Sequence, residues 1–327
     1  MTKQQVFGGI FGLCVGDALG VPVEFRSREF LASDPVRDMI GFGTHNQPPG
    51  TWSDDSALAL CLAESLCNGF NPADAGARIV RFAREAYWTP FGRVFDIGNT
   101  TKMAAARLAD PNIAPEEAGL RSETDNGNGS LMRILPLAFA LGGLPFPDRM
   151  EHVSTISSLT HGHPRSVVAC TIYVETAVEL LAGRAPDAAY HHMRATVHEN
   201  LRSHAELAHF RRILEEEIAT LPQSEIESGG YVVHTLEAAL WSFLTSNSYS
   251  ESVLKAVNLG GDSDTTGAVT GGLAGLAYGF KAIPKNWVEQ LPRKMEIGEV
   301  AEKLYAFHTG TTPRVDAQEK SGRRPVT

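Results

Sequence analysis

The chain has 327 residues, of which 43% are hydrophobic and 20% charged, and its formal net charge is −9 at pH 7. This composition is typical of a soluble globular enzyme with a sizeable core, and the acidic balance excludes a general nucleic-acid or membrane-surface binder, which would need a basic face. We find no run that is long and apolar enough to span a bilayer and no signal-peptide pattern. The four cysteines form no CxxC pair, so we expect free thiols and a cytoplasmic protein.

The first motif in chain order is a Gly-rich turn at residues 16–20, which leads through Val21-Pro22-Val23 to Glu24. A glutamate directly after such a turn can occupy a mobile loop at the mouth of a site. A solvated surface acid is the simpler alternative for Glu24.

An acidic cluster follows at Ser53-Asp54-Asp55, and Leu58, Cys61, Leu62 and Leu66 continue it at the 3–4 spacing of a helix. Ser53 is a preferred helix cap, and acids in a first turn are favoured by the helix dipole. The cluster can therefore be a plain helix start, a set of metal ligands, or both.

Three more polar turns precede predicted helices. Residues 96–101 open one, Gly127-Asn128-Gly129-Ser130 precedes an apolar helix predicted for residues 131–141, and His161-Gly162-His163 precedes a helix at 164–182. Backbone amides at the second turn could hold phosphate, although no Gly-Lys-Ser/Thr follows as in a Walker loop. The simpler alternatives are helix capping for residues 96–101, a plain loop for residues 127–130, and a structural role for the histidines at 161 and 163.

The remaining pattern is helical as well. Residues 186–219 read as one or two polar, surface-leaning helices, and apolar spacing predicts helices around 233–243 and 297–307. Strands do not alternate with turns or helices anywhere, so the predicted fold class is all-α. We find no interdomain linker, and we expect one domain over residues 1–308 and a disordered polar tail at 309–327.

The segment 256–280 combines many glycines with the acidic motif Asp262-x-Asp264-Thr265. Each glycine inside a helix costs roughly 1 kcal/mol relative to alanine, so we expect this helix to pass close to other backbones and to bound ions. If the motif meets Ser53-Asp54-Asp55, four carboxylates and two hydroxyls converge, and such hard oxygen ligands suit Mg²⁺ or Mn²⁺. Helix capping is the alternative, whereas an EF-hand fails because Leu273 would stand where a bidentate glutamate is required.

Taken in order, these motifs resemble those of the ADP-ribosylglycohydrolase family. The matching stretches are 16–25, 49–60, 95–101, 126–138, 159–164 and 258–279. The resemblance implies a single compact, orthogonal all-α domain with a central cleft that holds two Mg²⁺ or Mn²⁺ ions.

The resemblance also assigns roles to residues. It places metal ligands at Ser53, Asp54, Asp55, Asp262, Asp264 and Thr265, where Ser53 keeps the hydroxyl of the family's usual threonine. It places Glu24 beside the substrate, and we expect Glu24 or Asp55 to be the catalytic acid or base. The ADP-ribose cleft would be lined by Asp96, Gly98, Asn99, Gly127, Asn128, Gly129, Ser130 and His161.

The implied activity is hydrolysis of the C1″ glycosidic bond between ADP-ribose and a modified acceptor, by a monomer that releases ADP-ribose. The acceptor could be arginine, serine, a nucleic-acid end or a small molecule. Two other classes stay open: a non-catalytic binder of ADP-ribose or of a partner protein, and a dinuclear-metal phosphoesterase.

Overall fold

A computed structural model describes residues 1–310, and these residues form α-helices and short 3-10 turns without a β-strand. Residues 311–327, which make up most of the predicted tail, lie outside the described part. The α-helices are α1 (Lys3–Gly20), α2 (Arg28–Ser33), α3 (Asp54–Leu66), α4 (Pro72–Glu85), α5 (Asn99–Leu108), α6 (Ala138–Leu141), α7 (Phe146–Ser157), α8 (Pro164–Leu181), α9 (Pro186–Leu201), α10 (Arg211–Leu214), α11 (Val232–Leu244), α12 (Tyr249–Val257), α13 (Ser263–Tyr278), α14 (Lys285–Gln290) and α15 (Lys294–Thr309). The all-α prediction is confirmed.

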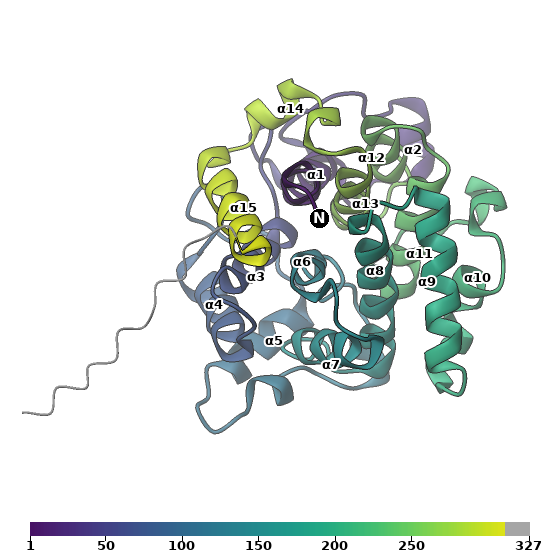
Figure 1. Cartoon of the computed structure of the whole chain (residues 1–327). Helices are drawn as coiled ribbons and strands as arrows, with labels where there is room; N and C mark the ends of the chain where they lie inside the picture. Colours follow the sequence, from purple (N-terminus) through teal and green to yellow (C-terminus); the bar gives the residue numbers. More distant parts are fainter. Residues whose placement is uncertain (311–327) are drawn as a thin grey trace, which may run out of the picture.

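The helices run in several directions around a central pair, α1 and α13. In Figure 1, α1 is seen almost end-on near the middle, α9 runs upright and α7 lies across the view, so many helices cross at steep angles. This arrangement agrees with the orthogonal helical fold expected from the sequence.

The central pair is held together by two stripes of glycine. Gly8, Gly12 and Gly16 on α1 face Gly275, Gly271 and Gly267 on α13, each spaced four residues apart. A Cβ at Gly12 would lie only 2.4 Å from the carbonyl oxygen of Gly271, so the two backbones touch directly. The crowded centre predicted from the glycines of segment 256–280 is therefore present, and α1 supplies the opposing backbone.

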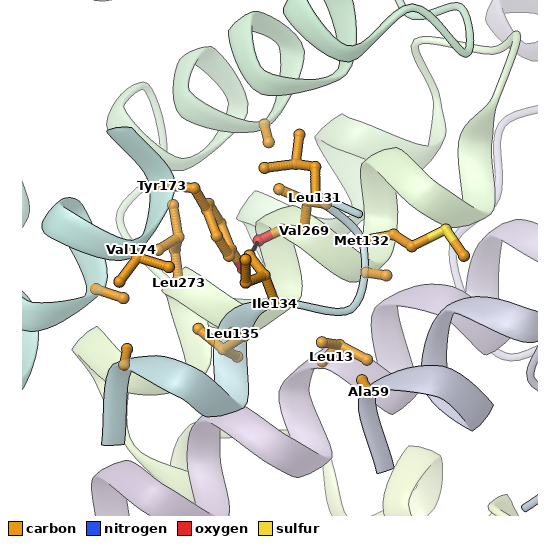
Figure 2. Packing of buried hydrophobic residues seen from close by; sticks show 14 of the residues in the cluster. Leu13, Ala59, Leu131, Met132, Ile134, Leu135, Tyr173, Val174, Val269 and Leu273 are labelled. Atoms are coloured by element: carbon orange, nitrogen blue, oxygen red, sulfur yellow. Dashed lines mark hydrogen bonds between the residues drawn. The ribbon is translucent and has the colours of Figure 1, made fainter. Parts of the chain in front are cut away.

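Buried side chains from distant parts of the chain pack around this pair. Figure 2 shows Leu13 of α1, Ala59 of α3, Tyr173 of α8 and Leu135 in one buried cluster with Val269 and Leu273 of α13. The Tyr173 hydroxyl donates a 2.9 Å hydrogen bond to the carbonyl of Val269, within α13. The glycines thus let α13 lie at the middle of the core, with Asp262 and Asp264 at its N-terminal end.

The centrality of α1 corrects one expectation. The segment Lys3–Val23 has a mean hydropathy of 1.8 and is long enough to span a bilayer, so the statement that no such run exists is wrong by length and composition. In this fold 94% of the most apolar 18-residue stretch of that segment is buried. Its place in the core accounts for its apolar sequence.

The predicted helix over residues 131–141 is also wrong. Residues 131–133 form turns, a 3-10 turn covers 135–137, and only α6 is helical. Pro136 lies in the middle of the segment, and a proline there removes a backbone donor and clashes with the preceding helical turn.

The Gly-rich turn predicted at residues 16–20 is wrong as well, because these residues form the end of α1 and only Val21–Val23 make a 3-10 turn. The following local predictions hold. Residues 164–181 form α8 despite their β-branched side chains, and the four cysteines are unpaired. The polar region 186–219 forms α9 and α10 with short 3-10 turns, although Tyr190 and Met193 of α9 are buried.

Candidate metal centre and substrate cleft

The two acidic motifs meet where α3 and α13 begin. Asp54 and Asp55 occupy the first turn of α3, and Asp264 occupies the first turn of α13. The Thr265 hydroxyl donates a 3.3 Å hydrogen bond to Asp55 Oδ1, which joins positions 210 residues apart in the sequence. Two half-sites that the sequence placed separately thus form one cluster.

Helix capping explains only part of this cluster. The Ser53 hydroxyl accepts from the backbone N–H of Asp55 at 3.3 Å, as an N-cap does. Asp262 precedes α13 but makes no side-chain cap bond; its Oδ2 accepts from the Asn128 amide at 2.9 Å instead. The capping alternative therefore fails for Asp262.

Three carboxylate oxygens of the cluster are buried without any hydrogen-bond partner. They are Asp55 Oδ2, Asp262 Oδ1 and Asp264 Oδ2. A buried acceptor without a partner is destabilising, and several in one place indicate a missing electropositive group. An all-oxygen set of carboxylates and hydroxyls fits Mg²⁺ or Mn²⁺ rather than a thiolate-binding metal.

Electrostatics support the same conclusion. Burial is the main cause that raises the pKa values of Asp54, Asp55 and Asp264 well above the usual range, and neighbouring carboxylates raise them further. The cleft thus holds more negative charge than the fold itself neutralises, which a bound divalent cation would offset.

Glu24 adjoins this cluster and is buried, with only 4% of its surface exposed, so the surface-acid alternative is wrong. One oxygen each of Glu24, Asp262 and Asp264 lie within 4.8 Å of one another. The expected mobile loop is instead held in place directly after Glu24: the Phe25 N–H donates to the Gly261 carbonyl at 2.7 Å, and the Gly261 N–H donates to the Arg26 carbonyl at 2.9 Å.

His45 was not predicted as a site residue, yet it hydrogen-bonds the Glu24 carboxylate. Its ring also lies 5.2 Å from that of Phe95, centroid to centroid. Burial raises the pKa of Glu24 to about 7, the hydrogen bond to Glu24 raises the pKa of His45, and burial raises the pKa of nearby Asp96. His45 lies in the 3-10 turn Gly43–His45, and no spacing in the sequence distinguishes it.

Asp17 is a second residue that the sequence motifs did not reveal. It lies in α1, fully buried, and accepts from the backbone N–H groups of Ser53 (2.9 Å) and Ser56 (3.0 Å) and from the Ser56 hydroxyl (2.5 Å). Asp17 therefore fixes the start of α3, and with it Asp54 and Asp55. Only the spatial packing of α1 against α3 shows this role.

The cluster lies in a cleft of about 280 Å³. Its lining includes these predicted residues: Glu24, Asp54, Asp55, Asp96, Gly98, Asn99, Gly127, Asn128, Gly129, His161, Asp262 and Thr265. Five lining residues were not predicted: Phe25, Thr100, Thr101, Met132 and Gly230. Ser53 and Asp264 are not in the lining. The Ser53 side chain caps α3, and the Asp264 side chain is buried behind the cleft surface.

Ser130 is the predicted cleft residue that the structure places elsewhere. Its side chain is fully buried in the core, where its hydroxyl lies 3.0 Å from that of Ser157 and 3.4 Å from the Cys170 sulfur. No helix begins at this turn, so the hydroxyl has no solvent-facing cap position to occupy.

The neighbouring turn does face the cleft and is held in place from two sides. The Asn128 N–H donates to the Gly230 carbonyl at 3.1 Å, ahead of α11. A Cβ at Gly129 would lie 2.7 Å from the His161 ring, so glycine is needed for the close approach. Burial lowers the pKa of His161 to about 3, which keeps this imidazole neutral.

The cleft contains no lysine or arginine among its described lining residues. Besides α3 and α13, α5 also begins at the cleft: Gly98 precedes it without a side-chain cap, and its first residues, Asn99, Thr100 and Thr101, line the cleft. The backbone N–H groups of this first turn make the N-terminal end of α5 electropositive. It lies beside the acidic cluster in the same cleft.

Comparison with known proteins agrees with this geometry. The family model described as ADP-ribosylglycohydrolase matches residues 1–313. The chain belongs to this family. The resemblance inferred from the motifs is confirmed, and with it the prediction of a glycosidase-type hydrolase.

Relatives within the ADP-ribosylglycohydrolase family match over most of their length. The ADP-ribosylarginine hydrolase Tri1 of Serratia proteamaculans is 33% identical, with 93% of this chain and 80% of the relative covered. The ADP-ribosyl-(dinitrogen reductase) glycohydrolase of Rhodospirillum rubrum is 32% identical, with 90% and 92% covered. A solved structure named ADP-ribosylglycohydrolase-related protein complex superposes with a TM-score of 0.79 at 36% identity, over 94% of this chain and 98% of that one.

Proposed function

We propose that this ADP-ribosylglycohydrolase removes ADP-ribose from an arginine side chain of a modified protein, with Mg²⁺ or Mn²⁺ as cofactor. The observation that carries the metal requirement is the set of three buried, unpartnered carboxylate oxygens in the cleft. The names of two relatives, one for ADP-ribosylarginine and one for dinitrogen reductase, support arginine on a protein as the acceptor.

The residues that would hold the metal are those of the two acidic motifs: Ser53, Asp54, Asp55, Asp262, Asp264 and Thr265. When bound, two divalent cations would orient the substrate by coordinating the ribose hydroxyls and would offset the negative charge of the carboxylates.

The chain's own residues suit the remaining demands of glycoside hydrolysis. Breaking the C1″ bond develops positive charge on the ribose, and the acidic cleft stabilises that charge. Glu24, with a pKa of about 7, can hold a proton for the departing group near neutral pH. Asp55 remains the alternative acid or base. Glu24 and Asp96 both line the cleft, and one oxygen of each lies within 4.8 Å of the other, so an ionised pair would attract the guanidinium of an arginine acceptor.

The diphosphate needs a different environment, which the backbone supplies. We place it against the N–H groups at the start of α5 and of the Gly127–Gly129 turn, because no lysine or arginine lines the described cleft and His161 is neutral. This assignment adds the start of α5 to the turn at residues 127–130, which was expected to hold phosphate ahead of a helix that is absent.

The test is mass-spectrometric product analysis with arginine-, serine- and nucleic-acid-linked ADP-ribose, each with Mg²⁺ and with EDTA. We expect intact ADP-ribose from the arginine-linked substrate only when metal is present. Release from another substrate alone would reassign the acceptor, and release of AMP or phosphate would indicate a phosphoesterase. Binding of ADP-ribose without release from any substrate would indicate a binder. The monomeric state and the cytoplasmic location stay predictions.

A further inference from the structure

Two phenylalanines beside the cleft have an unusual combination of backbone strain and exposure. Phe25 and Phe42 have φ angles of 63° and 67°, and their side chains are 68% and 59% exposed. A positive φ is rare for a bulky residue. Phe42 has ψ −108°, which lies outside even the left-handed helical region. Strained residues of this kind cluster at functional sites.

Core packing does not explain these side chains, because both are exposed. The segment that carries Phe42 is nevertheless firmly attached to the catalytic segment. The Thr44 hydroxyl donates to the Glu24 carbonyl at 2.7 Å, and Gly43 lies so close to Pro22 that a Cβ would be 1.8 Å from the Pro22 carbonyl oxygen. The fold therefore holds Phe42 in a fixed position next to the segment that bears Glu24.

A second hollow, of about 380 Å³, adjoins the cleft across this segment. Phe25 lines the cleft, whereas Val23 and Arg26 on either side of the Glu24–Phe25 pair line the hollow. The apolar side chains that line the hollow are those of Pro22, Val23, Phe30, Pro35, Val36 and Ile40. Its charged part consists of Arg26, Asp34, Arg37 and Asp38, two of each sign.

We propose that this hollow, together with Phe25 and Phe42, is the docking surface for the polypeptide around the modified residue of a protein substrate. This inference rests on the proposed function. A chain that leaves the cleft past Phe25 reaches the hollow next, since the two share one wall. A hollow lined by apolar side chains and by charged side chains of both signs suits a substrate peptide that buries one apolar side chain there and pairs its polar groups with the charged ones.

The substitution Phe42→Gly tests the surface without breaking the fold, because glycine adopts positive φ freely. Ile40→Ser removes a second exposed side chain, and neither residue lines the cleft. The matched control is Phe307→Ser on α15, since Phe307 is 43% exposed and lines neither hollow. All variants are assayed with an arginine-ADP-ribosylated protein and with free ADP-ribosylarginine.

We expect the Phe42→Gly, Ile40→Ser double variant to lose about tenfold in kcat/KM on the modified protein, with activity on free ADP-ribosylarginine and the Phe307→Ser control unchanged. Equal losses on both substrates, or no loss on either, would overturn the docking surface and leave the proposed function standing. If the wild-type protein hydrolyses neither substrate, the proposed function fails and this inference fails with it. A change of oligomeric state in the double variant, seen by analytical ultracentrifugation, would assign the surface to a second copy of the chain instead.

Discussion

At the scale of single residues, the decisive feature is a set of carboxylates that the fold buries without neutralising. Asp55, Asp262 and Asp264 each keep one oxygen free of any hydrogen bond. Natural proteins rarely leave such groups unless they contact an ion or a ligand. The consequences can be measured by removing one charge at a time.

Asp264→Asn removes one buried charge but keeps the size of the side chain. We expect the metal-free variant to unfold at the same temperature as the metal-free wild type or at a higher one, because repulsion among the carboxylates falls. Its metal affinity should drop by about 100-fold or more, and hydrolysis should fall with it. Thermal unfolding with increasing Mg²⁺ checks this, and an undiminished Mg²⁺-dependent rise in the unfolding temperature would contradict it.

Glu24→Gln should separate chemistry from metal binding. The amide keeps the shape of the side chain but cannot exchange a proton, so we expect kcat to fall by about 100-fold. Calorimetric Mg²⁺ titration should give nearly the wild-type affinity, since the six proposed ligands are intact. Full turnover by this variant would refute a catalytic Glu24.

At the scale of elements, the contact between α1 and α13 decides whether the half-sites meet. Both helices present glycine where their backbones touch. Because α13 begins immediately after Asp262, any displacement of this pair also displaces the metal ligands.

Gly12→Ala should test this contact, because the added methyl would lie 2.4 Å from the Gly271 carbonyl oxygen. We expect the free energy of unfolding to fall by about 3 kcal/mol from overpacking. The control is Gly298→Ala in α15, where the nearest atom is 4.0 Å away and alanine should stabilise the helix by about 0.5–1 kcal/mol. Denaturant unfolding of both variants gives the comparison, and equal stabilities would show that the close contact contributes nothing.

Comparison of sequence and structure at this scale shows which signals are local. The acidic motifs and the glycines of 256–280 are each recognisable within a few residues, so the sequence could predict that the motifs meet and that this helix packs closely against another backbone. The helix at 131–141 failed because apolar composition was given more weight than Pro136. Asp17 and His45 could not be found, since each acts through a partner tens of residues away, as Asp17 does on Ser53.

At the scale of the whole molecule, the acidic cleft couples stability to pH. Folding raises the pKa values of Asp17 and Glu24 to about 6 and about 7, and those of Asp54, Asp55 and Asp264 rise well above the usual range. A carboxyl with a raised pKa holds its proton more tightly in the folded state than in the unfolded one. These groups therefore make the folded state less stable as pH rises from about 4 through 7.

We expect the unfolding temperature of EDTA-treated protein to fall between pH 5 and pH 8, and the stabilisation by added Mg²⁺ to grow over the same range, because protons and metal compete for the carboxylates. Thermal scans at several pH values, with and without Mg²⁺, check both trends. Asp264→Asn should flatten the metal-free trend. A metal-free protein that becomes more stable with rising pH would contradict the argument.

The pairing of α1 with α13 also sets an order of events during synthesis. The ribosome makes α1 first, but its partner begins only at Ser263. At typical translation rates the wait lasts roughly 10–50 s. Throughout that time the nascent chain carries an apolar helix with no place to pack and one half of a metal site with no counterpart. A chain cut short before α13 can neither bury that helix nor complete the site, so we expect it to depend on chaperones and to be degraded rather than to act as a partial enzyme.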